Sequence, residues 1–122
     1  MSIAQKCAAI AQKDGRYAAD AYAFVFEGLE YTLRHLGRDG HITGKELAEG
    51  IRDKAIEEFG GLARMVFDRW GVRKTDDFGE MVFNLVNAGL MGKTESDSID
   101  DFRDVYDFAA AFPLTVTPRT KS

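Results

Sequence analysis

The stretch AADAYAFVFEGLEYTLRHL, residues 18–36, is the longest segment of the chain with one hydrophobic period. Large apolar side chains recur there at spacings of one, three and four residues, which places them on one face of an α-helix. These side chains are Tyr22, Val25, Phe26, Leu29, Leu33 and Leu36. Phe24, Gly28 and Tyr31 form a second, partly apolar stripe. A helix with two such stripes is either central in a bundle or presents one stripe to a partner. The pattern predicts a helical bundle and leaves open whether Phe24 and Tyr31 lie in the core or at an interface.

Four further segments on either side of this helix have helical periodicity: 2–14, 44–59, 62–70 and 76–88. Ser2 with Gln5, and Thr43 with Glu46, have the spacing of capping boxes, in which two side chains satisfy free backbone groups at a helix start. Thr75 stands where an N-cap is expected, before two acidic residues that suit a helix N-terminus. Glycine follows most of these segments, as is typical of helix C-termini. The sequence therefore predicts about five helices.

The last two of these helices have distinct apolar and polar faces. The buried face predicted for the first of them consists of Leu62, Val66 and Trp70. The buried face predicted for the second consists of Phe78, Met81, Val82, Leu85 and Val86. The polar side chains expected to face solvent on that helix are Asp76, Asp77, Glu80, Asn84 and Asn87. Because Trp70 shares a stripe with apolar residues, we interpret it as a core residue rather than as a ligand contact.

The segment after Leu90 has a different pattern. Residues 91–94 and 102–108 alternate imperfectly between apolar and polar side chains, which allows a C-terminal β-hairpin. Three helices followed by a hairpin is the element order of a winged helix, so residues 44–108 are expected to be winged-helix-like. The predicted fold class is mainly α: a compact bundle of about five helices, with the hairpin as an option.

Length and composition are those of one globular domain. The chain has 122 residues, of which 45% are hydrophobic and 30% charged. No apolar run approaches the length of about 18 residues that a membrane span needs. The single cysteine, Cys7, excludes an internal disulfide framework, and this points to the cytoplasm. Residues 1–113 are expected to form a single helical domain and residues 114–122 a flexible C-terminal tail.

The distribution of charge bears on whether the protein binds nucleic acid. The chain has 16 basic and 20 acidic residues, and residues 1–60 and 61–122 each carry eight basic and ten acidic ones. Without a basic half, nucleic-acid binding is the less favoured class. An acidic run near the C-terminus is interrupted only by a single arginine and consists of Glu95, Asp97, Asp100, Asp101, Asp104 and Asp107. A basic run precedes it and consists of Arg64, Arg69, Arg73 and Lys74.

No motif with established chemistry is present. Residues 35–46 lie between two helices like a calcium-binding loop, but His35 and Gly37 occupy its first and third positions, where oxygen ligands are needed. A turn followed by a helix cap explains the same residues. His35 and His41 lack the spacing of a transition-metal site. The chain has no nucleophile elbow, phosphate-binding glycine loop or dinucleotide fingerprint, so we predict no catalytic, metal-ligating or cofactor-binding residue and no cofactor.

Several phrases in combination resemble a known family. They are Ala21–Thr32, Thr43–Leu47, Phe78–Leu90, Lys93-Thr94, Tyr106–Phe108 and Ala111-Phe112. The chain is similar through them to a paralogous family of small bacterial proteins of unknown function, found in verrucomicrobial and planctomycete-type genomes. The resemblance covers most of residues 13–113. It implies a standalone, single-domain, cytoplasmic protein and assigns no activity, substrate or site residue.

Three hypotheses about function follow. The first is a non-catalytic protein-interaction or adaptor domain whose acidic run binds an unidentified, basic protein partner. The alternative is a nucleic-acid-associated winged-helix regulator that uses the basic run. The third is a small enzyme with a carboxylate site, for which paired carboxylates in an enclosed pocket would be needed. None of the three involves a membrane, and none fixes the oligomeric state.

Overall fold

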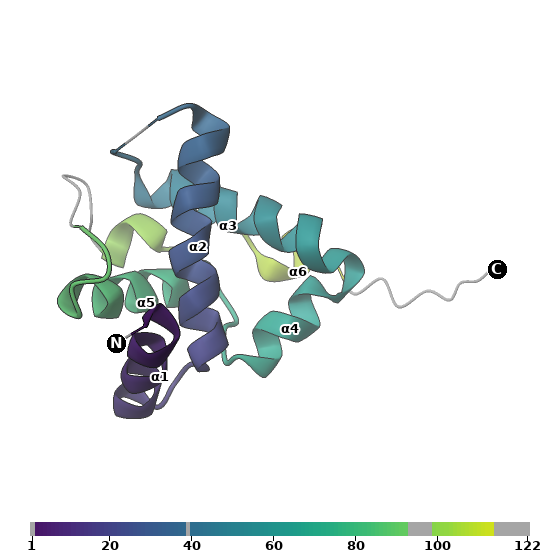
Figure 1. Cartoon of the computed structure of the whole chain (residues 1–122). Helices are drawn as coiled ribbons and strands as arrows, with labels where there is room; N and C mark the ends of the chain where they lie inside the picture. The colour runs from purple at the N-terminus through teal and green to yellow at the C-terminus, as the bar shows by residue number, and fades with distance from the viewer. Residues whose placement is uncertain (1, 39, 93–98, 114–122) are drawn as a thin grey trace.

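The computed structural model describes residues 2–38, 40–92 and 99–113, and these residues form helices joined by turns, with no strand among them (Figure 1). The α-helices are α1 (Ile3–Asp14), α2 (Ala19–Leu36), α3 (Gly44–Phe59), α4 (Ala63–Arg69), α5 (Thr75–Asn87) and α6 (Phe108–Ala111). Two 3₁₀ turns complete the list: η1 (Gly60–Leu62) and η2 (Ile99–Phe102). The mainly helical prediction is confirmed, and the ends of α1 to α5 lie within one residue of those predicted.

Helix α2 is the centre of the bundle. It packs against α1, α3 and α5, and Figure 1 shows it crossing α3 and running past α1. Both apolar stripes of the helix are used. Phe24 is only 5% exposed and belongs to the core. Tyr31 is half-buried, and its hydroxyl donates a hydrogen bond of 2.8 Å to Glu57 of α3. Phe24 is therefore a core residue, and Tyr31 joins α2 to α3 within the same chain.

The crossing of α2 and α3 is unusually close because glycine stands at the contact on each helix. A Cβ atom on Gly28 would lie 2.9 Å from Ile51, and one on Gly50 would lie 1.8 Å from the hydroxyl oxygen of Thr32. The Thr32 hydroxyl donates instead to the Gly28 carbonyl, at 2.6 Å. Close packing of this kind requires that these two positions carry no side chain.

A buried lysine lies at the same crossing. The ammonium group of Lys54 on α3 lies 4.2 Å from the ring centroid of Phe24, hydrogen-bonds Glu58 and lies 3.5 Å from Glu27. Its side chain is only 8% exposed. A cation over an aromatic face, with carboxylates as counter-charges, is a satisfied arrangement for a buried ammonium group. Lys54 therefore links α2 to α3 without leaving an unpaired charge in the core.

The buried face of helix α4 only partly matches the predicted one, in which Val66 is half-buried. Phe67 is 1% exposed, and Trp70 packs at 5.6–5.9 Å against the rings of Phe24, Phe59 and Phe67, as expected for a core-associated residue. The prediction for Leu62 was wrong, because its side chain is 60% exposed. The glycines before it form η1 rather than a turn of α-helix, which shifts Leu62 away from the interior.

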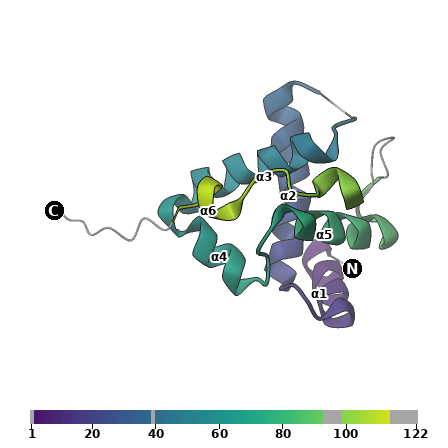
Figure 2. The same cartoon turned by 180° about the vertical axis from the view of Figure 1, so that it is seen from behind.

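The C-terminal segment folds across α3 and α5 as an irregular strap (Figure 2). The ring of Phe102 fills the space over Gly44 and Gly79, where a Cβ atom would lie 3.0–3.1 Å from it. The Thr75 hydroxyl donates to the Phe102 carbonyl at 2.6 Å and accepts from the Val105 amide at 3.0 Å. These bonds anchor the strap directly to the first residue of α5.

Three sequence predictions concern this strap, and the one about Thr75 is wrong. The hairpin over 91–94 and 102–108 is not confirmed: residues 102–108 hold a 3₁₀ turn and bends, while residues 93–94 lie outside the described part. Without strands among the described residues, the winged-helix reading of 44–108 has no support. Thr75 is not a cap, because its hydroxyl is used by the strap; Asp77 accepts instead from the amides of Arg73 and Lys74.

Three further expectations concern the helix caps, membrane spans and the C-terminal tail. The capping boxes of Ser2 with Gln5 and of Thr43 with Glu46 are confirmed. Within the described ranges, no helix has the length and apolar character of a membrane span. The tail predicted over 114–122 lies outside these ranges.

We predict that Gly50→Ala lowers the free energy of unfolding by about 1–3 kcal/mol, because the new methyl group would overlap Thr32 and push α2 and α3 apart. Urea denaturation measures the change. Adding Thr32→Ala to Gly50→Ala should recover part of the loss. Gly40→Ala is the control, since a Cβ atom there meets nothing within 4 Å. Equal effects of Gly50→Ala and Gly40→Ala would contradict the close crossing.

Candidate functional site

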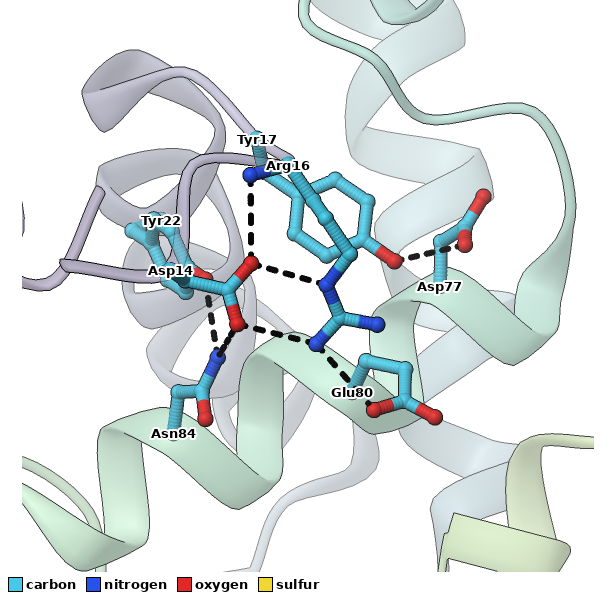
Figure 3. Close-up of polar contacts among 7 residues, drawn as sticks. All are labelled: Asp14, Arg16, Tyr17, Tyr22, Asp77, Glu80 and Asn84. Carbon is cyan, nitrogen blue, oxygen red and sulfur yellow. Dashed lines mark hydrogen bonds and ion pairs between the residues drawn. The ribbon is translucent and has the colours of Figure 1, made fainter. Parts of the chain in front are cut away.

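A polar cluster of seven residues lies where the α1–α2 loop meets α5 (Figure 3). The loop is positioned by Gly71, whose φ of +86° and close approach to the Arg16 carbonyl leave no room for a side chain. The amide of Ala18 donates to the Trp70 carbonyl at 3.1 Å. The loop between α4 and α5 therefore holds the loop between α1 and α2 at a fixed place beside α5.

A chain of hydrogen bonds and ion pairs runs across this contact. Arg16 donates to both carboxylate oxygens of Asp14, at 2.8 and 2.9 Å, and reaches Glu80 of α5 at 3.3 Å. The side-chain amide of Asn84 donates to Asp14 at 3.1 Å and to the hydroxyl of Tyr22 at 3.0 Å. Tyr22 is fully buried, so Asn84 satisfies a hydroxyl that has no access to water.

Tyr17 and Asp77 extend the cluster to the start of α5. The Tyr17 hydroxyl donates to Asp77 at 2.6 Å, and the other oxygen of that carboxylate accepts the amides of Arg73 and Lys74. One carboxylate thus caps α5 and binds the α1–α2 loop at the same time. Negative charge at this helix end is also favoured by the helix dipole.

The cluster shifts the pKa values of its members. The hydrogen bond from Arg16 lowers the pKa of Asp14 to about 2, against the opposing effect of its partial burial. Burial, followed by the hydrogen bond to Asp77, raises the pKa of Tyr17 well above its ordinary value. Asp14 is therefore held charged and Tyr17 neutral across the physiological range, so neither is suited to exchange protons near pH 7.

The polar face of α5 points at neighbouring elements and not only at solvent. Asp77, Glu80 and Asn84 are half-buried in the cluster, and Asp76 accepts the Asp104 amide at 3.0 Å. The expectation that these four side chains face solvent is therefore only partly met, because each is half-buried and bonded to another element, whereas Asn87 is exposed as expected. Asp77, Glu80, Asn84 and Asp76 lie where the α1–α2 loop and the strap cover α5. Helical periodicity alone does not show that other elements cover this side.

An open groove adjoins the cluster. It has a volume of about 330 Å³ and is lined by Ile10, Lys13, Asp14, Asn84, Asn87 and Ala88. Asp14 and Asn84, its two half-buried polar residues, are bonded to each other and to Arg16 and Tyr22. The arrangement joins α1, α2 and α5, which is a structural role.

The predicted acidic residues are only partly described. Glu95 and Asp97 lie outside the described residues. Asp100, Asp104 and Asp107 are exposed and Asp101 is half-buried, all four on the strap. Asp104 has a φ of +53°, and its backbone is held by Asp76. Arg103 lies among them and pairs with Asp100 at 2.6 Å. The structure thus places these four aspartates on one short segment.

The predicted basic residues do not share one face. Arg64 and Arg69 are five positions apart on α4, which places them about 140° apart around the helix axis. Arg64 and Arg73 line one hollow beside α6, and Arg73 pairs with Asp68 at 3.3 Å. Lys74 is exposed just before α5. A duplex-binding ridge would need these cations on a common surface.

The loop between α2 and α3 has no metal-binding geometry in its described residues. The carboxylate of Glu46 accepts the Thr43 amide at 2.9 Å and Arg38 at 2.7 Å, so it serves as a cap; the Thr43 bond is the main cause of its lowered pKa. His35 stacks on Tyr31 at 4.0 Å. Nowhere in the described ranges do three or more His, Cys, Asp or Glu side chains gather as metal ligands.

Sequence reasoning missed Asp14, Arg16, Tyr17 and Tyr22 as parts of a polar cluster. The available signal was the spacing of the polar side chains of α5, since positions 77, 80 and 84 form one helical stripe next to the apolar face. A polar stripe of this kind needs partners when another element covers it. The loop that covers it could not be identified without its tertiary position.

Comparisons of the chain with family models, with curated proteins and with solved structures find no match. The resemblance to a bacterial paralogous family therefore stays a prediction. Conclusions about function rest on the residues and their geometry.

We predict that the bonds of Asp14 to Arg16 and Asn84 contribute fully to stability only while Asp14 is ionised. Its folded-state pKa of about 2 lies below the ordinary value of 3.8, so this stability is present above pH 4 and is lost as the pH falls toward 2. Asp14→Asn should therefore destabilise the protein at pH 6, and its difference from the wild type should shrink as the pH falls to 2. Glu30→Gln, the same charge change on the exposed face of α2, is the control. A pH-independent difference for Asp14→Asn, measured by chemical denaturation, would contradict this role.

Proposed function

We propose that the protein is a non-catalytic interaction domain, an adaptor, that binds a basic segment of a partner protein through the acidic strap. The acidic strap denotes Asp100, Asp101, Asp104 and Asp107. The observation that carries the proposal is that three of these side chains are exposed on a segment whose backbone is fastened to the core.

The attachment of the strap to the core supports binding, because a backbone that is already ordered loses less conformational entropy when a partner binds. Tyr106, in the middle of the strap, donates from its hydroxyl to the Ala48 carbonyl of α3 at 2.7 Å. Its ring also stacks on Phe108 and lies 5.6 Å below the guanidinium of Arg52. Side chains displayed on a rigid backbone lose less entropy on binding than those on a loose loop.

The electrostatics of the strap fit a cationic partner. Among the described residues of the strap, aspartates outnumber arginines, and the Arg103–Asp100 pair is about 70% exposed on both sides. An exposed pair of this kind contributes little stability, so a partner's lysine or arginine can replace Arg103 at small cost. Acidic surfaces of this kind mainly accelerate association and select partners by charge.

The polar groups elsewhere support an interaction role over a catalytic one. The carboxylates of Asp14 and Asp77 are each engaged by donors from a neighbouring element. A general acid or base needs a carboxyl group whose protonation can change during the reaction. The lowered pKa of Asp14 works against that use.

The proposal predicts that a fluorescent lysine- and arginine-rich peptide of about ten residues binds the protein at low salt and is displaced by salt. Asp104→Asn with Asp107→Asn should weaken this binding about three- to tenfold, since two charge pairs are lost. Asparagine retains the positive φ that Asp104 adopts. Fluorescence anisotropy measures the affinity.

The matched control is Asp20→Asn with Glu30→Gln, which changes the net charge equally on exposed positions of α2. This control should bind the peptide as the wild type does. If both double variants lose affinity equally, the binding reflects net charge alone and the proposed face is wrong. Circular dichroism confirms that each variant is folded.

A further inference from the structure

A hollow of about 290 Å³ lies between α4 and α6, on a part of the surface that the acidic strap does not line. Its lining residues are Arg64, Asp68, Val72, Arg73 and Phe108. Two arginines and one aspartate therefore line a small concave surface. In the other described groups with more than one ion pair, a single cation meets two carboxylates: Arg16 pairs with Asp14 and Glu80, and Lys54 pairs with Glu27 and Glu58.

The walls of the hollow are fixed by the core. Val72 is 1% exposed and Phe108 is 5% exposed, and the ring of Phe108 lies 5.5 Å from that of the buried Phe67 on α4. The backbone of Arg73 is held by the bond of 2.8 Å from its amide to Asp77. Arg64 projects from the first turn of α4. Both arginines therefore extend from a backbone that is already in place.

The charges in the hollow are not balanced internally. Asp68 is the acidic residue among those that line the hollow, and it pairs with Arg73 at 3.3 Å. That pair is about two-thirds exposed on each side, so an incoming anion can replace Asp68 at little cost. Arginine is well suited to this exchange, because its planar group binds oxyanions through two parallel hydrogen bonds.

From this geometry we propose that the hollow binds the phosphate group of a phosphomonoester. A phosphate dianion matches two guanidinium groups in charge and offers acceptors to both. The volume lies just below the lower end of the range of about 300–1,000 Å³ for ligand sites. It therefore suits a phosphate with a small organic group attached, over a floor made of Val72 and Phe108.

The same chemistry could come from a small metabolite or from a phosphorylated side chain of a protein. The experiment uses phenyl phosphate for the first source, a phosphotyrosine peptide for the second and the unphosphorylated peptide as a blank. Titration calorimetry measures binding to the full chain. We expect saturable binding of a phosphorylated probe and none of the blank. Tighter binding of the peptide by tenfold or more identifies a protein source, and equal binding identifies a small molecule.

The variants test the hollow itself. Arg64→Gln and, separately, Arg73→Gln should each weaken binding about tenfold or more, while Asp68→Asn should strengthen it severalfold by removing the competing carboxylate. Arg69→Gln removes the same charge from another face of α4 and should leave binding unchanged. Far-ultraviolet circular dichroism shows whether each variant is folded, and the two arginine variants give independent tests.

Several results would overturn the proposal. The first is the absence of saturable binding of either phosphorylated probe. The second is an equal loss with Arg69→Gln and Arg64→Gln, which would assign the affinity to general positive charge. The third is tighter binding of a DNA or RNA oligonucleotide than of either probe, weakened by Arg69→Gln and Lys74→Gln as well. That result would favour a nucleic-acid surface over the hollow.

Discussion

The close contact between α2 and α3 is the constraint on which the rest of the structure depends. Gly28 and Gly50 let the two helices approach until Thr32 and Ile51 fill the space that side chains would occupy. This approach brings Lys54 over the ring of Phe24 and places α4 beside the N-terminal half of α2. A bundle of this size has one small core, so an error at its central crossing would disturb most of the other contacts.

Polar bonds attach the remaining elements to that centre. Asp14, Arg16 and Asn84 join α1 and its loop to α5, and Thr75 joins the strap to α5. Asp14, Asn84 and Thr75 are buried or half-buried, so their polar groups must be satisfied, and each bond also fixes the relative position of two elements. The two surfaces that we propose for partners both lie on backbone that such bonds hold in place: the strap with its aspartates and the hollow with its two arginines. Their opposite charges would let the proposed adaptor contact two different ligands.

Much of the fold was predictable from the sequence because local signals agree with the tertiary structure. The period of α2, the capping boxes and the terminal glycines specify the five longest helices to within one residue. Thr75 was misassigned because the hydroxyl of a threonine at a helix start can either cap the helix or bond to another segment. The position of the Phe102 carbonyl, which accepts its hydrogen bond, decides between the two. The strap resembled strands because its aromatic residues anchor an irregular backbone at nearly alternate positions. The polar cluster could not be predicted, since residues 14 and 84 are brought together by packing alone. The acidic and basic sets were visible as runs of sequence, but only the structure separates Arg64 and Arg73 from Arg69.

The claim that connects fold and function is that the strap is part of the core, although it has almost no regular secondary structure. Native-state hydrogen exchange of the amides of Asp104 and Val105, which donate to Asp76 and Thr75, tests it most directly. We expect both amides to exchange with an opening free energy close to that of the buried amides of α2. Exchange at the rate of an unprotected chain at these two positions would contradict it, because the aspartates would then be carried on a loose segment.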